Sequence, residues 1–224
     1  MVGFHTAATP PHPPPNVTEN APSTSMEVFL KQRSGQCAVK SVCWIAALAE
    51  VAVIISTEHP ESWLFKKTLT LLVPLPGSQE NIHLSPLFLL GTLMASLGGC
   101  IRWYCYRALG NLFTFEMSIR NEHKLVTDGP YGVVRHPGYS GILLAVIGII
   151  FWHASPGSWA RECGIFQNTL GRIAGCTYLA LTTTILFGLI SRMAAEDAAL
   201  RRVFGVQWDD WARRVPYKLI PWVI

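Results

Sequence analysis

The sequence predicts an all-α, polytopic integral membrane protein with about four to five transmembrane helices. Of its 224 residues, 50% are hydrophobic and only 14% are charged, whereas a soluble domain carries about 25% charged residues. A chain of this size has too little interior to hide so much apolar surface in one core. The apolar residues also gather in four long runs, so burial in a lipid bilayer explains the excess.

The four runs cover Val39–Ser56, Leu84–Tyr106, Tyr139–His153 and Ile173–Ile190. A spanning helix needs about 20 residues, so the second run is long enough and the first and fourth are near the lower limit. The third spans if its helix begins at Pro137, a residue that suits the first helical turn. The stretch Trp63–Leu75 contains two lysines and ends in prolines. We expect it to be an interfacial helix or a luminal loop, and a fifth span is the weaker alternative.

Three regions divide the chain. Residues 1–25 form a predicted disordered, Pro-rich tail, 26–110 contain the N-terminal transmembrane helices, and 111–224 contain two further spans and a C-terminal interfacial helix. The tail lacks the basic start and the apolar stretch of a signal peptide. The six cysteines include no CxxC pair, so no metal site is expected.

Lys and Arg residues are distributed unevenly around the runs. With four spans, the N-terminal segment, the central loop and the C-terminal tail share one side and carry most of the 18 Lys and Arg residues. The opposite side carries only Lys66, Lys67, Arg161 and Arg172. By the positive-inside rule, the central loop and the C-terminal tail should face the cytosol. The net charge of +4 is modest and no basic run is present, so nucleic acid is not an expected partner.

The central loop, residues 125–141, holds the most informative motif. Asp128–Tyr131 predicts a tight turn, and Pro137 keeps His136 out of helical geometry. His136 should therefore stand at the start of a membrane helix, where free N–H groups and the helix dipole favour an anion. Gly138 and Gly141 would let a ligand approach the backbone closely. The loop thus has the features of a binding site for a carboxylate or phosphate.

A second interpretation of this loop stays open. Tyr131 and Tyr139 are typical of the aromatic belt at a membrane surface, and Arg135 and His136 could face lipid head groups. In that case the loop would anchor the protein rather than bind a ligand.

Two carboxylates near the spans are further candidates. Glu196 lies four residues after Arg192, so both share one helix face, where they form either a surface ion pair or a functional pair. In the functional interpretation, Arg192 holds a substrate carboxylate and Glu196 accepts hydrogen bonds from a cofactor. Glu50 lies inside the first run and is either functional or a helix-packing carboxylate, protonated or paired with a cation such as Arg102.

The C-terminal tail is rich in aromatic and basic residues. Trp208 and Trp211 lie three positions apart and share one helical face. This pattern predicts an amphipathic helix at the membrane interface, followed by a terminal strap.

Together, the two motifs resemble the isoprenylcysteine carboxyl methyltransferase family and the wider set of membrane methyltransferases that includes phospholipid methyltransferases. The resemblance covers roughly residues 110–216, about half of the chain. It is carried by His123–Val126, Gly129–Tyr131, Arg135–Tyr139, Gly141, Glu196–Asp197, Phe204–Gly205 and Val215–Pro216. The chain departs from the family pattern at Asp197, where a second glutamate is usual, and in the long segment Ser155–Arg172.

The resemblance implies a multi-pass enzyme of the endoplasmic reticulum membrane, with its catalytic face and cofactor pocket in the cytosol and residues 111–224 as its methyltransferase region. It implies S-adenosyl-L-methionine as the cofactor. The implied substrate is the C-terminal prenylcysteine of lipidated proteins, which would be reached in the membrane lipid. By the family pattern, the cofactor would contact His123, Lys124, Leu125, Val126, Tyr131, His136, Pro137, Gly138, Tyr139 and Glu196. Arg192 would be the catalytic residue, facing the substrate carboxylate.

The implied reaction moves a methyl group from a sulfonium to a carboxylate. A carboxylate is already ionised near pH 7, so no general base is needed. The enzyme must supply positioning and exclude water. The prenyl chain could enter between spans, where Gly91, Ala95, Gly98 and Gly99 would leave either a groove or a close helix contact.

Other activities stay open at this point. Phospholipid (phosphatidylethanolamine) N-methylation uses the same cofactor but needs a proton acceptor, for which Glu50, Glu116 or Asp197 would be candidates. An NADPH-dependent sterol reductase-like protein carries a similar Arg-His-Pro-x-Tyr motif, but would need more spans, and the chain has no Gly-rich dinucleotide fingerprint. A non-catalytic scaffold would not explain why both motifs face one side. The oligomeric state is left open.

Overall fold

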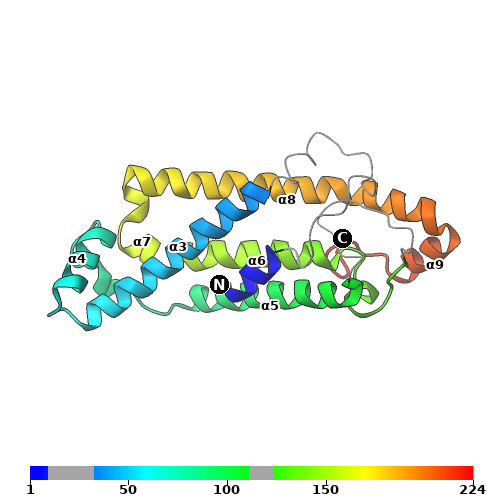
Figure 1. Ribbon diagram of the computed structural model, residues 1–224. Helices are drawn as coiled ribbons and strands as arrows, with labels where there is room; N and C mark the ends of the chain where they lie inside the picture. The colour runs from blue at the N-terminus through cyan, green and yellow to red at the C-terminus, as the bar shows by residue number, and fades with distance from the viewer. Residues whose placement is uncertain (10–32, 111–123, 224) are drawn as a thin grey trace.

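The computed structural model describes residues 1–9, 33–110 and 124–223, and within these ranges every regular element is a helix. Of the described helices, four are long and apolar enough to cross a membrane. They are α3 (Arg33–Glu58), α5 (Pro86–Leu109), α6 (Pro137–Ala154) and α8 (Thr169–Phe204). All four run along the length of the molecule, with α3 tilted across the others (Figure 1). The predicted multi-pass helical membrane protein is confirmed.

The third and fourth spanning helices begin at residues that favour a helix start, but the end of the fourth does not coincide with the end of its apolar run. The third begins at Pro137, as predicted. The fourth begins after Asn168, whose side chain accepts two backbone hydrogen bonds at the helix start. It continues for 36 residues, to Phe204, so the helix extends well beyond the apolar run that ends at Ile190. Arg192 and Glu196 therefore lie on the same continuous helix as the fourth span.

Small residues line the contact between α5 and α6. These are Gly91, Ala95 and Gly98 of α5 and Gly141, Ala145 and Gly148 of α6. A Cβ atom on Gly91 would lie 2.6 Å from the carbonyl oxygen of Gly148, and one on Gly98 would lie even closer to Gly141. The two backbones therefore touch, as is common between membrane helices with small residues one turn apart. The hypothesis of a prenyl groove at these glycines is wrong, because helix packing fills the space.

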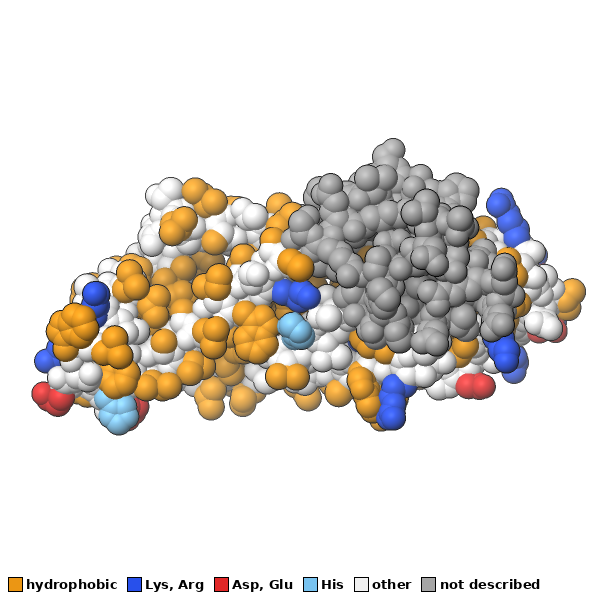
Figure 2. Space-filling view, viewed as in Figure 1, with side chains coloured by type: hydrophobic (Ala, Val, Ile, Leu, Met, Phe, Trp, Pro, Cys, Tyr) orange, Lys and Arg blue, Asp and Glu red, His pale blue; other side chains and the backbone are white. Residues whose placement is uncertain are grey.

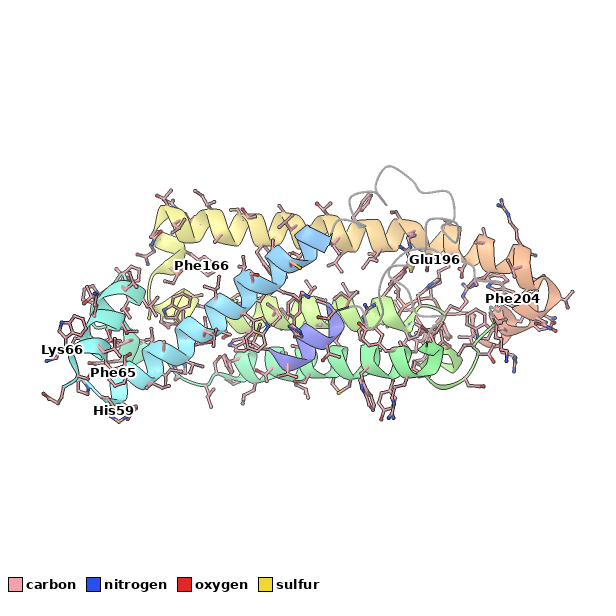
Figure 3. The ribbon with its side chains drawn as sticks, viewed as in Figure 1. His59, Phe65, Lys66, Phe166, Glu196 and Phe204 are labelled. Carbon is pink, nitrogen blue, oxygen red and sulfur yellow. The ribbon has the colours of Figure 1, made fainter. Side chains whose placement is uncertain are left out.

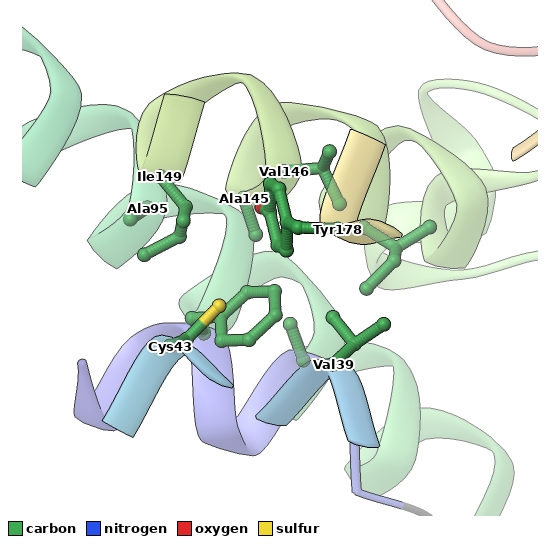
Figure 4. Close-up of a cluster of buried hydrophobic side chains, with 10 residues drawn as sticks. Val39, Cys43, Ala95, Ala145, Val146, Ile149 and Tyr178 are labelled. Carbon is green, nitrogen blue, oxygen red and sulfur yellow. The ribbon is translucent and has the colours of Figure 1, made fainter. Parts of the chain in front are cut away.

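The largest buried cluster lies where the spans meet the short helix α1 (Val2–Ala7). Figure 4 shows its members from α3, α5, α6 and α8: Val39, Cys43, Ala95, Ala145, Val146, Ile149 and Tyr178. Outside the cluster, large side chains such as Leu93 and Phe187 are exposed. In Figure 2, hydrophobic side chains dominate the middle of the visible face, and most visible charged groups lie toward the two ends. This distribution suits a protein whose middle is surrounded by lipid.

The first nine residues differ from the predicted disordered tail. Residues 2–7 form α1, in which Phe4 and Ala7 are 1% and 0% exposed. Gly3 packs directly on the α5 backbone at Gly99. The expectation of disorder is wrong for this segment because tertiary packing, which composition does not reveal, can stabilise a short helix. The proline cluster that follows lies outside the described residues.

Four short helices lie at the end of the molecule opposite the central loop (Figure 1). They are α4 (Trp63–Leu72), η2 (Ser78–Asn81), α7 (Trp159–Glu162) and η5 (Ile165–Gln167). With 10 residues, α4 is too short to cross a bilayer. Glu50 also lies at this end, where it accepts hydrogen bonds from Trp152 Nε1 and from the Trp159 backbone N–H, both at 3.0 Å. These bonds favour the helix-packing interpretation of Glu50.

At the other end, α9 (Val206–Arg214) and η4 (Gly129–Gly132) pack together. Trp208 and Trp211 are only 8% and 3% exposed, and they contact Val215 within the protein. Trp211 Nε1 also donates a hydrogen bond to the Tyr131 carbonyl at 3.1 Å. The predicted amphipathic helix is present, and its tryptophan face packs against the rest of the protein. The spacing of the tryptophans identifies an apolar face of α9, but not what covers that face.

Candidate functional site

The central loop and the end of α8 meet at one end of the spans. The Tyr139 hydroxyl donates a hydrogen bond to Glu196 Oε1 at 2.7 Å. His136 lies between two carboxylates, with Nε2 3.2 Å from Asp197 Oδ1 and Nδ1 3.5 Å from Glu196 Oε2. Figure 3 labels Glu196 on α8, toward the end that carries Phe204. The expectation that these two motifs come together is confirmed.

Glu196 is the centre of one set of contacts. Arg192 Nη2 lies 2.5 Å from Glu196 Oε1, and the two side chains are only 10% and 18% exposed. The interpretation of a surface ion pair is therefore wrong, because the pair is largely buried. The same oxygen accepts the Tyr139 hydrogen bond, so the first turn of α6 and the end of α8 share one carboxylate.

Asp197 is the centre of a second set. Besides His136, its carboxylate faces Arg135 Nη1 at 3.5 Å and Lys218 Nζ at 4.0 Å. In the sequence, Asp197 is part of the second motif, a departure from the family pattern and one candidate proton acceptor, but it was not predicted to contact the central loop. Its contact with His136 joins residues 61 positions apart, a distance that no local signal spans. The structure therefore adds Asp197 to the predicted site residues.

The C-terminal tail closes this cluster through its backbone. The N–H of Arg135 donates to the Tyr217 carbonyl at 2.9 Å, and the N–H of His136 donates to the Lys218 carbonyl at 2.8 Å. The Ser140 hydroxyl donates to the Leu219 carbonyl at 2.5 Å. These bonds hold the tail across the start of α6. The sequence signal for it was the pair Val215–Pro216, whose position in the site could not be read from the chain alone.

The His136 imidazole is buried within the cluster, at 8% exposed. Burial lowers its pKa, but hydrogen bonds with Asp197 and Glu196 and their negative charges raise it, and the net pKa lies above the usual 6.5. An imidazolium donates from both ring nitrogens, which matches a carboxylate on each side. Together with Arg135, Arg192 and Lys218, the imidazolium gives the cluster a net positive charge.

This arrangement predicts pH-dependent stability. Because the His136 pKa is higher in the folded protein than in the unfolded chain, the stabilisation is fully present below about pH 6.5 and is lost as the pH rises through the folded pKa. We expect the difference in melting temperature between wild type and His136→Gln to be largest at about pH 6 and to shrink toward about pH 9. Thermal unfolding in detergent measures it. His59→Gln, an exposed histidine at the opposite end, serves as the control, and a pH-independent difference for His136→Gln would contradict the assignment.

The other predicted site residues divide into three groups. Leu125 and Tyr131 pack on the Trp208–Trp211 cluster beneath the loop, and Pro137 and Gly138 are buried at the start of α6. Lys124 is exposed and Val126 is half-buried, and among the described residues neither contacts His136, Glu196 or Asp197. His123 lies outside the described residues, as does Glu116.

The interpretation of the loop as a membrane anchor does not fit these contacts. Arg135 and His136 pair with Asp197 inside the protein, and the Tyr139 hydroxyl bonds to Glu196. His136 also stacks on Tyr139, with ring centroids 5.5 Å apart and an angle of 6° between the planes. These groups are directed at one another rather than at lipid head groups.

The fold and the site define a multi-pass helical membrane protein with a buried, positively charged polar cluster at one end of its spans. Residues 90–157 match the model of the isoprenylcysteine carboxyl methyltransferase family. That segment includes His136 and Tyr139 but ends before Arg192 and Glu196. The match confirms the resemblance found in the sequence motifs.

Similar proteins include methyltransferases and a sterol reductase. Protein-S-isoprenylcysteine O-methyltransferase B of Arabidopsis thaliana is 33% identical over 147 residues, which cover 65% of this chain and 64% of the relative. A probable protein-S-isoprenylcysteine O-methyltransferase of Oryza sativa subsp. indica is 31% identical over 128 residues, 56% of each chain. The matched region thus spans less than two thirds of these relatives. Mouse Delta(14)-sterol reductase is 28% identical over 100 residues, 45% of this chain but only 20% of the reductase. No solved structure matches the chain.

Proposed function

We propose that the protein transfers a methyl group from S-adenosyl-L-methionine to the C-terminal carboxylate of a prenylated cysteine. The observation that carries this proposal is the junction of Tyr139 and His136 with Glu196 and Asp197 in one positively charged cluster. The relatives named as protein-S-isoprenylcysteine O-methyltransferases support the substrate class. The sterol reductase match covers a small part of that protein, so it supports the alternative less.

The charges of the cluster suit a carboxylate substrate. The substrate carboxylate is ionised near pH 7 and needs no base. Arg192 would hold one of its oxygens, and the other would attack the methyl group. A guanidinium has five N–H donors in a planar fork, so one arginine can serve a glutamate and a substrate carboxylate together. Burial of Arg192 and Glu196 keeps water away and strengthens these charge interactions.

The residues present also fit the methyl donor, which supplies an electrophilic methyl group when bound. Its amine and hydroxyl groups would donate to Glu196, and its carboxylate needs N–H donors. Arg135 Nε and Trp208 Nε1 are buried and have no acceptor among the described residues, as expected beside an anionic ligand. We assign the contacts of the family pattern to Lys124–Val126, Tyr131, His136–Tyr139 and Glu196. Within this set, Pro137 and Gly138 contribute backbone at the start of α6.

The location follows from the placement of charge. We assign the end that carries the cluster to the cytosol, because most Lys and Arg residues lie in segments on that side. The resemblance to the family supports the endoplasmic reticulum as the membrane that we propose for the protein. A prenylated acceptor would then reach the site from the lipid, and the methyl donor from the cytosol.

The test separates the acceptors by their products. Membranes containing the protein are incubated with S-adenosyl-L-methionine labelled in its methyl group, together with either a prenylcysteine or phosphatidylethanolamine. The proposal predicts label in the prenylcysteine as a methyl ester, which mild alkali releases as methanol. Label that enters the phospholipid and resists alkali would instead show N-methylation. Stabilisation by NADPH but not by S-adenosylhomocysteine would favour the reductase.

A further inference from the structure

Arg102 is a buried cation within the α5 span, at 5% exposed, and the proposed reaction assigns it no role. Its Nε donates to the Ala7 carbonyl at 2.9 Å and its Nη1 donates to the Gly138 carbonyl at 3.1 Å. A charged side chain inside a membrane helix is costly unless polar groups, such as backbone carbonyls, pair with it. The guanidinium therefore binds α1 on one side and α6 on the other.

The α1 side of this link is the last turn of that helix. The final carbonyls of a helix have no partner within the helix and carry partial negative charge. The Tyr106 hydroxyl lies 3.0 Å from the Thr6 carbonyl oxygen and 3.2 Å from that of Ala7. Arg102 Nε also contacts this hydroxyl at 3.1 Å. The end of α1 thus supplies acceptors to two neighbouring side chains of α5.

The α6 side of the link is the turn that presents the site. Gly138 lies between His136, which bonds to Asp197, and Tyr139, which bonds to Glu196. Because Arg102 binds the carbonyl of Gly138 itself, a displaced guanidinium would release the backbone that directs both side chains toward α8.

We propose that Arg102 is a positioning residue through which the N-terminal helix α1 holds the start of α6 in the geometry that binds the methyl donor. This inference rests on the proposed function and extends it to residues 1–9, far from Glu196 in the sequence. It makes α1 an element on which cofactor affinity depends, although α1 itself contributes no residue to the charged cluster.

A substitution in α1 can test the link without altering Arg102 or the site. A Cβ on Gly3 would lie 2.7 Å from the Ala95 carbonyl oxygen and 2.9 Å from Ser96 Cα. Both are backbone atoms of α5, so Gly3→Val should push α1 away from α5. Gly35→Val is the matched control, because a Cβ on that glycine meets nothing within 4 Å.

The experiment uses the full chain in detergent and measures S-adenosylhomocysteine affinity together with the KM and kcat of methyl transfer to a prenylcysteine. Gly3→Val and Arg102→Gln should each weaken S-adenosylhomocysteine binding by about tenfold, as is usual when the support of a binding residue is lost. KM for the methyl donor should rise more than kcat falls. The double variant should lose no more S-adenosylhomocysteine affinity than the single variant with the larger loss, because both substitutions act through the same link. Tyr106→Phe should show a smaller loss in the same direction.

The outcomes separate this inference from the proposed function. Wild-type affinity in Gly3→Val and Tyr106→Phe would overturn the link, even if Arg102→Gln fails to fold. Additive losses in the double variant, or an equal loss in Gly35→Val, would also overturn it. If the link fails but the wild-type protein methylates prenylcysteine in the same assays, the proposed function still holds. A wild-type protein that neither binds S-adenosylhomocysteine nor transfers a methyl group would contradict both the proposed function and the role of α1.

Discussion

Replacing Arg192 with alanine should abolish methyl transfer to a prenylcysteine and destabilise the protein. Arg192 and Glu196 form a buried pair, with side chains 10% and 18% exposed. Removal of one partner from a buried ion pair costs up to about 3–5 kcal/mol, and His136 and Tyr139, which remain beside Glu196, reduce this cost. That cost lowers the free energy of unfolding, and the loss of the contact with the substrate carboxylate should separately lower kcat/KM by more than about a hundredfold.

Arg192→Lys separates the two parts of this effect. Lysine keeps the positive charge beside Glu196 but lacks the planar fork that holds a carboxylate through two hydrogen bonds. We therefore expect melting temperature to recover in part and turnover to stay low. Initial rates, melting temperature and S-adenosylhomocysteine affinity are the measurements. Near-normal turnover in Arg192→Ala would contradict the catalytic role. If Arg192→Ala instead loses S-adenosylhomocysteine binding and keeps its substrate affinity, Arg192 contacts the methyl donor rather than the substrate.

Leucine at Gly98 should have the largest effect on folding. The α5 backbone touches the α6 backbone at Gly98 and Gly141, so a side chain there has no space. Overpacking of a well-packed interior costs at least about 1–3 kcal/mol, and here the obstacle is backbone rather than a flexible side chain. The displaced segment of α6 also carries His136 and Tyr139 at its start. We expect lower yield, a lower melting temperature and loss of activity.

Cys100→Leu is the control for this substitution. Cys100 lies two residues from Gly98 on the same helix, but it is exposed. Its replacement enlarges the side chain without entering the contact between α5 and α6, so yield and melting temperature should stay close to wild type. If Gly98→Leu were as stable as Cys100→Leu, the close packing of the two helices would be wrong.

The sequence predicted those parts of the fold whose signals are local. Apolar runs identified the four spans, and Pro137 marked the start of α6, because hydrophobicity and the missing N–H of proline act within one helix. The apolar run ends at Ile190, and Arg192 and Glu196 were expected just past it on one helix face. They lie on the same helix, which continues to Phe204, a length that the apolar pattern does not indicate.

Most residues of the candidate site were predicted from the sequence, but most of the contacts that join them were not. His136, Tyr139 and Glu196 were named from the motifs, and they do meet. A terminal strap was expected, but its individual contacts and the contact of Asp197 with His136 were not predicted, because they join segments 61 or more residues apart. Only the packing of α6 against α8 and the return of the tail bring these groups together, and neither leaves a periodic pattern in the chain.

The packing partners of the apolar segments at the two ends of the chain could not be predicted from the sequence. The α1 residues Phe4 and Ala7 are buried in the core, although the nearby prolines indicated disorder. Trp208 and Trp211 pack beneath the loop, although their spacing suited a membrane interface. In both cases the sequence identifies an apolar surface, but its partner is set by tertiary packing.

Binding of S-adenosylhomocysteine to the purified protein tests most directly whether the loop and the end of α8 form one cofactor site. Titration of wild type, His136→Gln, Glu196→Gln and the double variant gives four affinities. We predict saturable binding to wild type and a loss of affinity on the order of tenfold or more in each single variant. The double variant should lose much less affinity than the product of the two single losses, because the groups act together. Wild-type protein without affinity, or single variants that bind as tightly as wild type, would contradict it.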